Sequence, residues 1–225
     1  MTTRERVLAL VKRFRRVYPE AHCELDFKNP LQLLIATILS AQCTDKRVNM
    51  VTPGLFKKYP TAAAFAKANP TTLENEIRST GFFRSKTKSI RAACAAIESV
   101  HGGKVPDTME ALTALPGVGR KTANVVLGNA IGKSDGIVVD THVIRLSQRL
   151  RLTKETDAEK IERELMKVVP PSDWTLWSHW LIWHGRRRCF ARKPDCGACE
   201  VFNLCPSGKI FLKNGEARKP EPAAT

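Results

Sequence analysis

The sequence contains no long apolar run. Its longest apolar stretch, residues 33–39, is interrupted by Thr37 and is far shorter than the roughly 20 residues that cross a bilayer. The first residues, Met1–Val7, are charged and include no apolar signal region. We therefore expect a soluble, cytoplasmic protein that does not associate with a membrane.

Alternating patterns and repeats are also scarce. Only Gly136–Val139 hints at an extended segment, and no stretch recurs with a fixed period. Most apolar residues recur instead at helical spacing. The predicted fold class is therefore all-α.

Acidic residues are few, because 22 Asp and Glu stand against 37 Lys and Arg and leave a net charge of +15. An excess of this size favours a polyanionic partner, most often a nucleic acid. A basic surface without a partner is the alternative, and charge alone leaves it open.

A disulfide framework is not expected, because the seven cysteines are an odd number and a reducing compartment disfavours disulfides. Four of them follow the pattern C-x6-C-x2-C-x5-C, which favours a metal site: Cys189, Cys196, Cys199 and Cys205. Zinc sites usually show two C-x2-C pairs, and four thiolates also suit a [4Fe–4S] cluster, so the spacing leaves the metal open. The remaining cysteines lie in helical contexts and are expected to be buried and inert: Cys23, Cys43 and Cys94.

Helical spacing predicts several helices. The first covers about residues 3–18, and the next follows Asn29 as its N-cap and is apolar nearly all round, which indicates a central core helix. Capping-box patterns begin at Thr71 and Thr156. A long helix is expected over 85–100.

Four tryptophans recur at three-residue spacing, at Trp174, Trp177, Trp180 and Trp183. We expect them to pack a second core, and a base-stacking platform is the alternative. His179 and His184 on the same helix are interpreted as structural histidines.

The stretch from Leu115 to Ala123 joins two helical patterns through a glycine-bearing turn, Pro-Gly-Val-Gly, which predicts a helix–hairpin–helix. Gly117 and Gly119 can adopt positive φ and let another backbone approach, and the N–H groups of such a turn suit a phosphate. Lys121 lies in the first turn of the second helix, where the helix dipole disfavours its ammonium form. An uncharged amine is what a lysine nucleophile needs.

The hairpin stretch, the later segment Val139-Asp140-Thr141-His142 and the four-cysteine pattern together resemble the endonuclease III family. This family comprises bifunctional DNA glycosylase/AP lyases among the helix–hairpin–helix glycosylases. The resemblance runs in order from about residue 3 to 212. A hairpin alone would be weak evidence, since many DNA-binding modules carry one, but the combination is specific.

The resemblance implies two helical domains that flank a DNA-binding cleft. A six-helix barrel would cover 23–133 and hold the hairpin at about 109–129. An iron–sulfur domain would combine 1–22 with 134–212, and its four cysteines would bind a [4Fe–4S] cluster. Residues 213–225 are expected to form a flexible C-terminal tail.

The resemblance also implies base-excision repair of double-stranded DNA that contains a damaged base or an abasic site. The protein would act as a monomer, at the nucleoid if its source is bacterial. An oxidised pyrimidine such as thymine glycol would be flipped out of the duplex. Lys121 would attack C1′ of the sugar and form a Schiff base, and β-elimination would cleave the strand on the 3′ side. Asp140 would stabilise the developing positive charge and assist proton transfers.

Further residues are expected to contact DNA. Gln42 matches the glutamine that the family inserts into the gap left by the flipped nucleotide. The second insertion position is usually leucine in the family and is Phe82 here, where the phenyl ring could act as a wedge. The hairpin and the basic loop beside the cysteines complete the predicted set: Gly117, Val118, Gly119, Arg120, Arg186, Arg192 and Lys193.

Each assignment has a structural alternative. Lys121 could contact phosphate only, Asp140 could be only a helix N-cap, and Phe82 could be a core aromatic. The basic run could simply balance the charge of the cluster. For the whole chain, a non-catalytic DNA-binding module would need neither Lys121 nor Asp140.

The adenine-removing branch of the superfamily is the nearest rival enzyme. It lacks the Schiff-base lysine and uses a carboxylate near the start of the core helix. This chain has no Asp or Glu between Asp26 and Asp45, so we disfavour that reading.

Overall fold

The computed structural model describes residues 1–218. Over that range the regular structure is entirely helical, as the predicted all-α class requires, and no helix in it is long and apolar enough to cross a membrane. The segment Gly136–Val139, expected to be extended, is an irregular connection without strand pairing. Its residues 137–139 are nevertheless buried.

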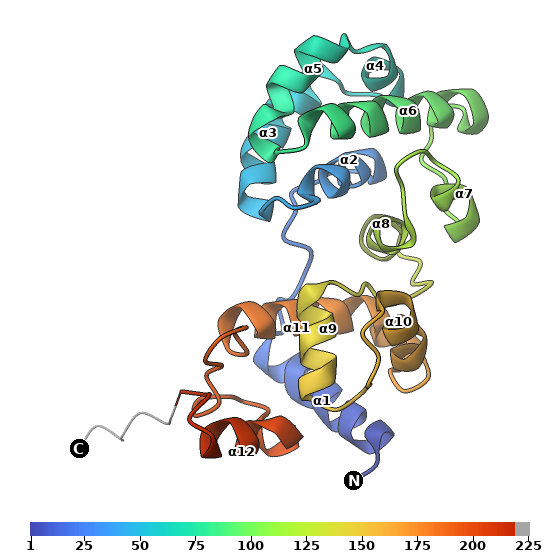
Figure 1. Cartoon of the computed structure of the whole chain (residues 1–225). Coiled ribbons are helices and arrows are strands. Elements are labelled where there is room, and N and C mark those ends of the chain that lie inside the picture. The colour runs from blue at the N-terminus through green and yellow to red at the C-terminus, as the bar shows by residue number, and fades with distance from the viewer. Residues whose placement is uncertain (219–225) are drawn as a thin grey trace. The chain divides into compact units, whose positions relative to one another are not determined.

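The chain divides into two compact units, which are described separately. The hairpin unit is Cys23–Asp135, and the cysteine unit joins Met1–His22 to the part of the chain that begins at Gly136. In Figure 1 the blue N-terminal helix accordingly packs among the yellow to red helices of the second half of the chain.

The hairpin unit is built around α2, the central helix that the sequence predicts. Asn29 caps α2 by accepting a hydrogen bond from the Gln32 N–H at 2.9 Å, and Leu33, Leu34 and Leu39 are fully buried. The helices of this unit (Figure 1) are α2 (Pro30–Ser40), α3 (Asp45–Lys58), α4 (Ala62–Lys67), α5 (Pro70–Ile77), the short η1 (Arg78–Thr80), α6 (Phe83–His101), α7 (Met109–Thr113), α8 (Arg120–Val126) and the π-helical η2 (Leu127–Ile131).

The two predicted capping boxes are wrong in register. Asn69, followed by proline, caps α5 in place of Thr71. Asp157 caps α10 (Ala158–Met166) in place of Thr156. The stronger N-cap side chains, Asn and Asp, prevail over the neighbouring threonines, and a proline at the first helical position is already set for the helix.

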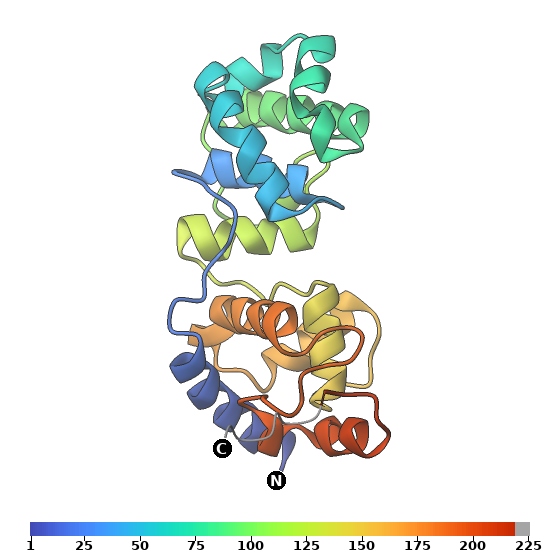
Figure 2. The same cartoon turned by 90° about the vertical axis from the view of Figure 1, so that its left-hand side faces the viewer.

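The cysteine unit packs its helices around aromatic side chains, as predicted for the tryptophan-rich segment. Trp177 and Trp180 are buried, and Phe14 of the N-terminal helix lies 6.3 Å and 6.5 Å from their ring centres. These two rings therefore cannot serve as an exposed base-stacking platform. The helices of this unit (Figure 2) are α1 (Thr3–Val17), α9 (Thr141–Arg149), α10, the short η3 (Pro171–Asp173), α11 (Trp174–Arg187), the short η4 (Phe202–Leu204) and α12 (Pro206–Lys213).

The beginning of the predicted C-terminal tail is ordered by backbone contacts. The Arg218 N–H donates to the Pro194 carbonyl at 2.9 Å, and the Gly197 N–H donates to the Arg218 carbonyl at 3.1 Å. Residue 213 is the last residue of α12. The rest of the predicted tail, 219–225, lies outside the described residues.

The three cysteines outside the pattern differ from one another. Cys94 is buried in α6, as expected. Cys23 and Cys43 are only half-buried and lie in connections rather than in helices, so the prediction of buried, helical sites is wrong for both.

Candidate nucleic-acid interface and cysteine site

The hairpin turn between α7 and α8 closes against α6. Gly117 has a φ of 77°, in the left-handed region that favours glycine. A β-carbon at Gly117 would lie 2.6 Å from the β-carbon of Ser89, so a larger residue could not approach α6 this closely. Gly119 differs, because its φ is −92° and a β-carbon there would meet nothing within 4 Å. The positive φ considered for both glycines is adopted only by Gly117.

Val118 anchors this turn from within. Its side chain is buried in the core of the hairpin unit, and its N–H donates to the Leu115 carbonyl at 3.1 Å. Gly117 and Gly119 on either side are exposed. The surface that the turn offers to a ligand is therefore the backbone around Val118 and not its side chain.

Lys121 is the second residue of α8, as the sequence predicts, and its side chain is exposed. It is preceded by the half-buried Arg120 and followed by Thr122, which lines the pocket described next. A primary amine at this position can reach a ligand that docks on the turn.

Turns that are far apart in the sequence surround one pocket of about 260 Å³ in the hairpin unit. The end of α2 contributes Gln42, the start of α6 contributes Phe82, and the hairpin contributes Gly117. Gln42 and Phe82 have φ of 53° and 47°, values that are uncommon for residues with a side chain. Phe82 is 63% exposed, so it is not the core aromatic considered as the alternative.

Asp140 belongs to the cysteine unit and caps α9. Its Oδ1 accepts a hydrogen bond from the Val143 N–H at 2.8 Å. Asp140 therefore has the capping role that was considered as the structural alternative, and its catalytic role stays a prediction. The carboxylate is half-buried, so a cap and a second function can coexist at this residue.

The four cysteines of the C-x6-C-x2-C-x5-C pattern line a single pocket of the cysteine unit. Burial and, to a smaller extent, the neighbouring thiolates raise the pKa of Cys196 to about 11 and that of Cys199 to about 12. Cysteine ligands lose their protons when they bind a positive centre, so these thiols would be deprotonated by a bound metal. Among residues 1–218, no group of three or more His, Cys, Asp or Glu side chains is already arranged to hold a metal ion.

Arginines from α9 support the first of these cysteines. The Arg149 guanidinium donates to Cys189 Sγ at 3.1 Å, and Arg145 donates to the Cys189 carbonyl at 3.0 Å. These contacts place positive charge and hydrogen-bond donors beside the thiol, which stabilises a thiolate ligand.

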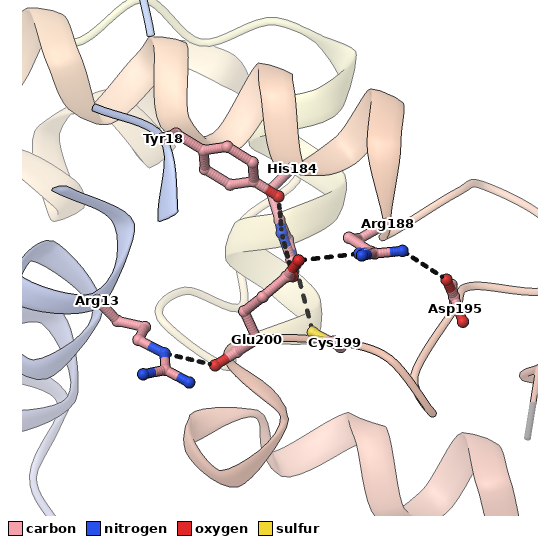
Figure 3. Close-up of polar contacts among 7 residues, drawn as sticks. All are labelled: Arg13, Tyr18, His184, Arg188, Asp195, Cys199 and Glu200. Carbon is pink, nitrogen blue, oxygen red and sulfur yellow. Dashed lines mark hydrogen bonds and ion pairs between the residues drawn. The ribbon is translucent and has the colours of Figure 1, made fainter. Parts of the chain in front are cut away.

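His184 links Cys199 to the N-terminal helix (Figure 3). Its Nε2 lies 3.4 Å from Cys199 Sγ, and its Nδ1 lies 2.9 Å from the Tyr18 hydroxyl. Burial lowers the pKa of His184 to about 4, so the ring is neutral at pH 7. A tyrosine hydroxyl that donates to Nδ1 leaves the ring proton on Nε2, directed at the sulfur. His184 is structural, as expected, and its partner is a cysteine of the pattern.

Comparisons with known proteins agree with these sites. The chain matches the HhH-GPD superfamily of base excision DNA repair proteins over residues 35–171. It is 54% identical over 206 residues to an endonuclease III of Synechocystis sp., and the aligned region covers 92% of this chain and 94% of that relative. The chain belongs to the endonuclease III family. The family resemblance seen in the sequence is thereby confirmed.

Solved structures of endonuclease III share the fold. A non-covalent endonuclease III–DNA complex has a TM-score of 0.89 and 41% sequence identity, with 95% of this chain and 100% of that chain covered. A trapped endonuclease III–DNA covalent intermediate has a TM-score of 0.88 and 41% identity, with coverage of 94% and 100%.

Part of the basic run that begins at the end of α11 is structural. Arg188 donates to the carboxylates of Asp195 and Glu200 at 3.0 Å each (Figure 3). The Arg187 guanidinium carbon lies 3.9 Å from the centre of the Trp183 ring. Arg188 therefore ties the end of α11 to the cysteine loop, whereas Arg187 packs on a ring of its own helix.

The remaining cations of this run are the predicted DNA contacts. Arg186, Arg192 and Lys193 are exposed, and Lys193 has a left-handed φ of 48°. Within this run, Arg188 pairs with carboxylates of the cysteine loop, while Arg186, Arg192 and Lys193 are exposed; their contact with DNA stays a prediction.

Three residues that line the hairpin-unit pocket or contact the cysteines were not predicted from the sequence. Lys86 and Ser89 line the hairpin-unit pocket, and Arg149 contacts Cys189. Each lies in an amphipathic helix where Lys, Ser and Arg are ordinary surface residues, so the sequence carried no signal for them.

Proposed function

We propose that this protein flips oxidised pyrimidines of the thymine glycol type out of double-stranded DNA, removes the base and cleaves the strand 3′ to the abasic site. Membership of a base excision repair family supports glycosylase and AP lyase chemistry. The observation that carries the assignment is Lys121, an exposed amine directly after the hairpin turn. The net charge of +15 suits a phosphate backbone. The protein acts as a monomer in the cytoplasm, where DNA is its partner.

Lys121 is the proposed nucleophile. Its deprotonated Nζ attacks C1′ of the flipped nucleotide, and the electron pair of the glycosidic bond leaves with the base, which takes up a proton. Opening of the sugar ring gives the Schiff base. Loss of a C2′ proton then expels the 3′ phosphate, so the strand is cut by β-elimination. Asp140 is the proposed carboxylate that stabilises positive charge on the sugar and assists the proton transfers.

Gln42 and Phe82 are the proposed gap-filling residues. Both lie on exposed turns that line the same pocket. A flipped nucleotide leaves an unstacked gap, and an inserted phenyl ring can stack against the adjacent bases. The exposed hairpin backbone and the cations Arg120, Arg186, Arg192 and Lys193 are proposed to hold the phosphates.

The four cysteines are proposed to bind a [4Fe–4S] cluster. Four cysteine thiolates suit such a cluster, and the four residues line one pocket of the cysteine unit. Their spacing contains one C-x2-C pair, whereas zinc sites usually show two. When bound, the cluster supplies a rigid crosslink of the loop that carries Arg192 and Lys193.

Borohydride trapping on a duplex with a single thymine glycol tests the proposal. Borohydride reduces a Schiff base to a stable amine, so the wild type should form a covalent protein–DNA adduct and Lys121→Ala should not. Lys88→Ala is the matched control, because Lys88 is an exposed lysine of the same unit and should leave the adduct intact.

The other outcomes overturn specific parts of the proposal. An adduct that persists in Lys121→Ala means that another amine attacks C1′. The absence of an adduct with wild type, on thymine glycol and on an abasic-site duplex alike, leaves only a monofunctional glycosylase or a binding protein.

A further inference from the structure

Lys86 is a buried lysine beside the pocket of the hairpin unit. It is 4% exposed, and its Nζ donates to the Leu39 carbonyl at 2.7 Å and to the Thr80 carbonyl at 2.8 Å. Burial lowers its pKa. A buried ammonium group is costly unless it is well hydrogen-bonded, so the two carbonyl partners are what allows this lysine to be buried.

Both partner carbonyls lie where a helix ends and a functional turn begins. Leu39 is the penultimate residue of α2, and the chain then turns through Ala41 and Gln42. Thr80 ends η1 and precedes Gly81 and Phe82. Carbonyls at helix ends lack partners inside the helix, and the ammonium group satisfies one from each turn.

A further hydrogen bond joins Lys86 to the Phe82 turn. Its backbone N–H donates to the Phe82 carbonyl at 3.0 Å. This backbone bond is the first i→i−4 bond of α6 and does not depend on the side chain. The ammonium group itself contacts the Phe82 turn and the Gln42 turn once each, over sequence separations of 6 and 47 positions. Gln42 and Phe82 both adopt left-handed φ, which residues other than glycine disfavour. Hydrogen bonds from outside the two turns therefore help to keep them in this conformation.

We propose that Lys86 is a positioning residue that holds the Gln42 and Phe82 turns at a set separation, so that both side chains are ready to enter the gap left by a flipped nucleotide. Lys86 does not touch DNA in this role, because it is buried and its ammonium group is occupied by the two carbonyls. The inference rests on the proposed function and adds to it the reason why the two insertion residues act together.

If Lys86 has this positioning role, its removal should reduce the preference for damaged over undamaged DNA as well as the stability of the protein. Lys86→Met keeps the apolar stem and removes the donors, so the two turns lose their common tie. Preorganised residues bind with a smaller entropic cost. The preference for a duplex with a tetrahydrofuran abasic analogue over the same undamaged duplex should therefore fall by about tenfold, the size expected for losing a charged hydrogen-bond pair.

Lys88→Met is the matched control. Lys88 lies two positions along α6 and is exposed, so its removal should weaken both duplexes equally and leave the preference unchanged. A change confined to Lys86→Met then reports the buried contacts and not the loss of one positive charge.

A double-mutant cycle separates positioning from general stabilisation. In a Gln42→Ala/Phe82→Ala background, the two side chains to be positioned are absent, so Lys86→Met should change the remaining preference by less than about twofold. If Lys86→Met does not fold, Lys86→Gln, which keeps amide donors on a shorter stem, enters the same cycle with a smaller expected effect.

The outcomes are distinguishable. Equal losses in both backgrounds, or no loss in the wild-type background, overturn the positioning role while leaving the proposed function intact. A wild type that shows no preference for the abasic analogue overturns the gap-filling function itself, and with it this inference.

Discussion

The two units present their chemistry in opposite ways. In the hairpin unit the residues proposed to act on DNA are exposed, on two turns and at the start of α8: Gln42, Phe82 and Lys121. In the cysteine unit the thiols are more enclosed: Cys196 is 9% exposed, Arg149 donates to Cys189 Sγ, and His184 lies beside Cys199 (Figure 3).

This difference indicates that the stability of the two units depends on different interactions. The core of the hairpin unit is mostly aliphatic, so we expect that its exposed turns can be altered without unfolding it. The cysteine unit encloses thiols whose pKa values are raised by burial and by one another. Its stability should therefore depend on what those thiols bind.

Removal of one thiol of the cysteine pattern should give the largest difference in stability between the two units. Cys199→Ser should abolish iron binding and destabilise the cysteine unit by at least about 3 kcal/mol, because metal-binding free energy is folding free energy in such sites. Iron analysis and hydrogen exchange resolved by segment provide the measurement.

The control for that variant lies in the other unit. Cys43 is a half-buried cysteine of the hairpin unit, and Cys43→Ser should retain all the iron. Full iron content in Cys199→Ser would show that Cys199 is not an iron ligand and would contradict the prediction that the cysteine unit depends on it.

Asp140 allows catalysis and capping to be separated within the cysteine unit. Asp140→Asn keeps an N-cap side chain but removes the negative charge, so base removal should slow by about 100-fold with little change in stability. Asp140→Ala should show the same slowing and lose a further ~1 kcal/mol of stability, because the hydrogen bond to the Val143 N–H is lost.

Single-turnover kinetics and thermal unfolding of the two variants provide the measurements. Normal base removal in Asp140→Asn together with a destabilised Asp140→Ala would show that the residue is only a cap.

Acid should weaken the cysteine unit through His179. Burial lowers the pKa of His179 to about 4, below the usual value of 6.5, so the unfolded chain takes up the proton first. Stability is fully present above about pH 6.5 and is lost as the pH falls towards 4, by about 2 kcal/mol at pH 5. Thermal unfolding at pH 7 and pH 5 should show this loss, and His179→Gln should reduce it. An unchanged pH dependence in the variant would contradict the assignment.

The hairpin turn offers the smallest effect and a matched pair of glycines. Gly117→Ala should destabilise the hairpin unit by about 1–2 kcal/mol, since alanine disfavours the left-handed φ and its β-carbon would meet Ser89 at 2.6 Å. Gly119→Ala should be neutral or slightly stabilising, because its φ is negative and its surroundings are open. Denaturant unfolding of both variants checks this, and equal effects would remove the distinction between the two positions.

Much of the local structure could be predicted from the sequence. Asn29 was predicted as a helix cap and is one, and the cap considered as the alternative for Asp140 is also present, because an N-cap depends on a side chain and an N–H a few residues away. The errors at Thr71 and Thr156 also arose locally, where a better cap lay within two residues. Cys43 was assigned to a helix although it lies in a connection, since apolar spacing alone does not mark where α2 ends.

The sequence by itself determined the family, the all-α class, the hairpin with Lys121 behind it and the four-cysteine pattern. These are properties of residue types at short spacing, where local geometry and chemistry act directly. Only the tertiary structure decided that Gln42, Phe82 and Gly117 share one pocket and that Lys86 ties two of their turns together. It likewise decided that Arg188 pairs internally while Arg192 is exposed. Such outcomes depend on which distant segments pack together, and the burial of a lysine or arginine depends on partners that its sequence neighbours do not reveal.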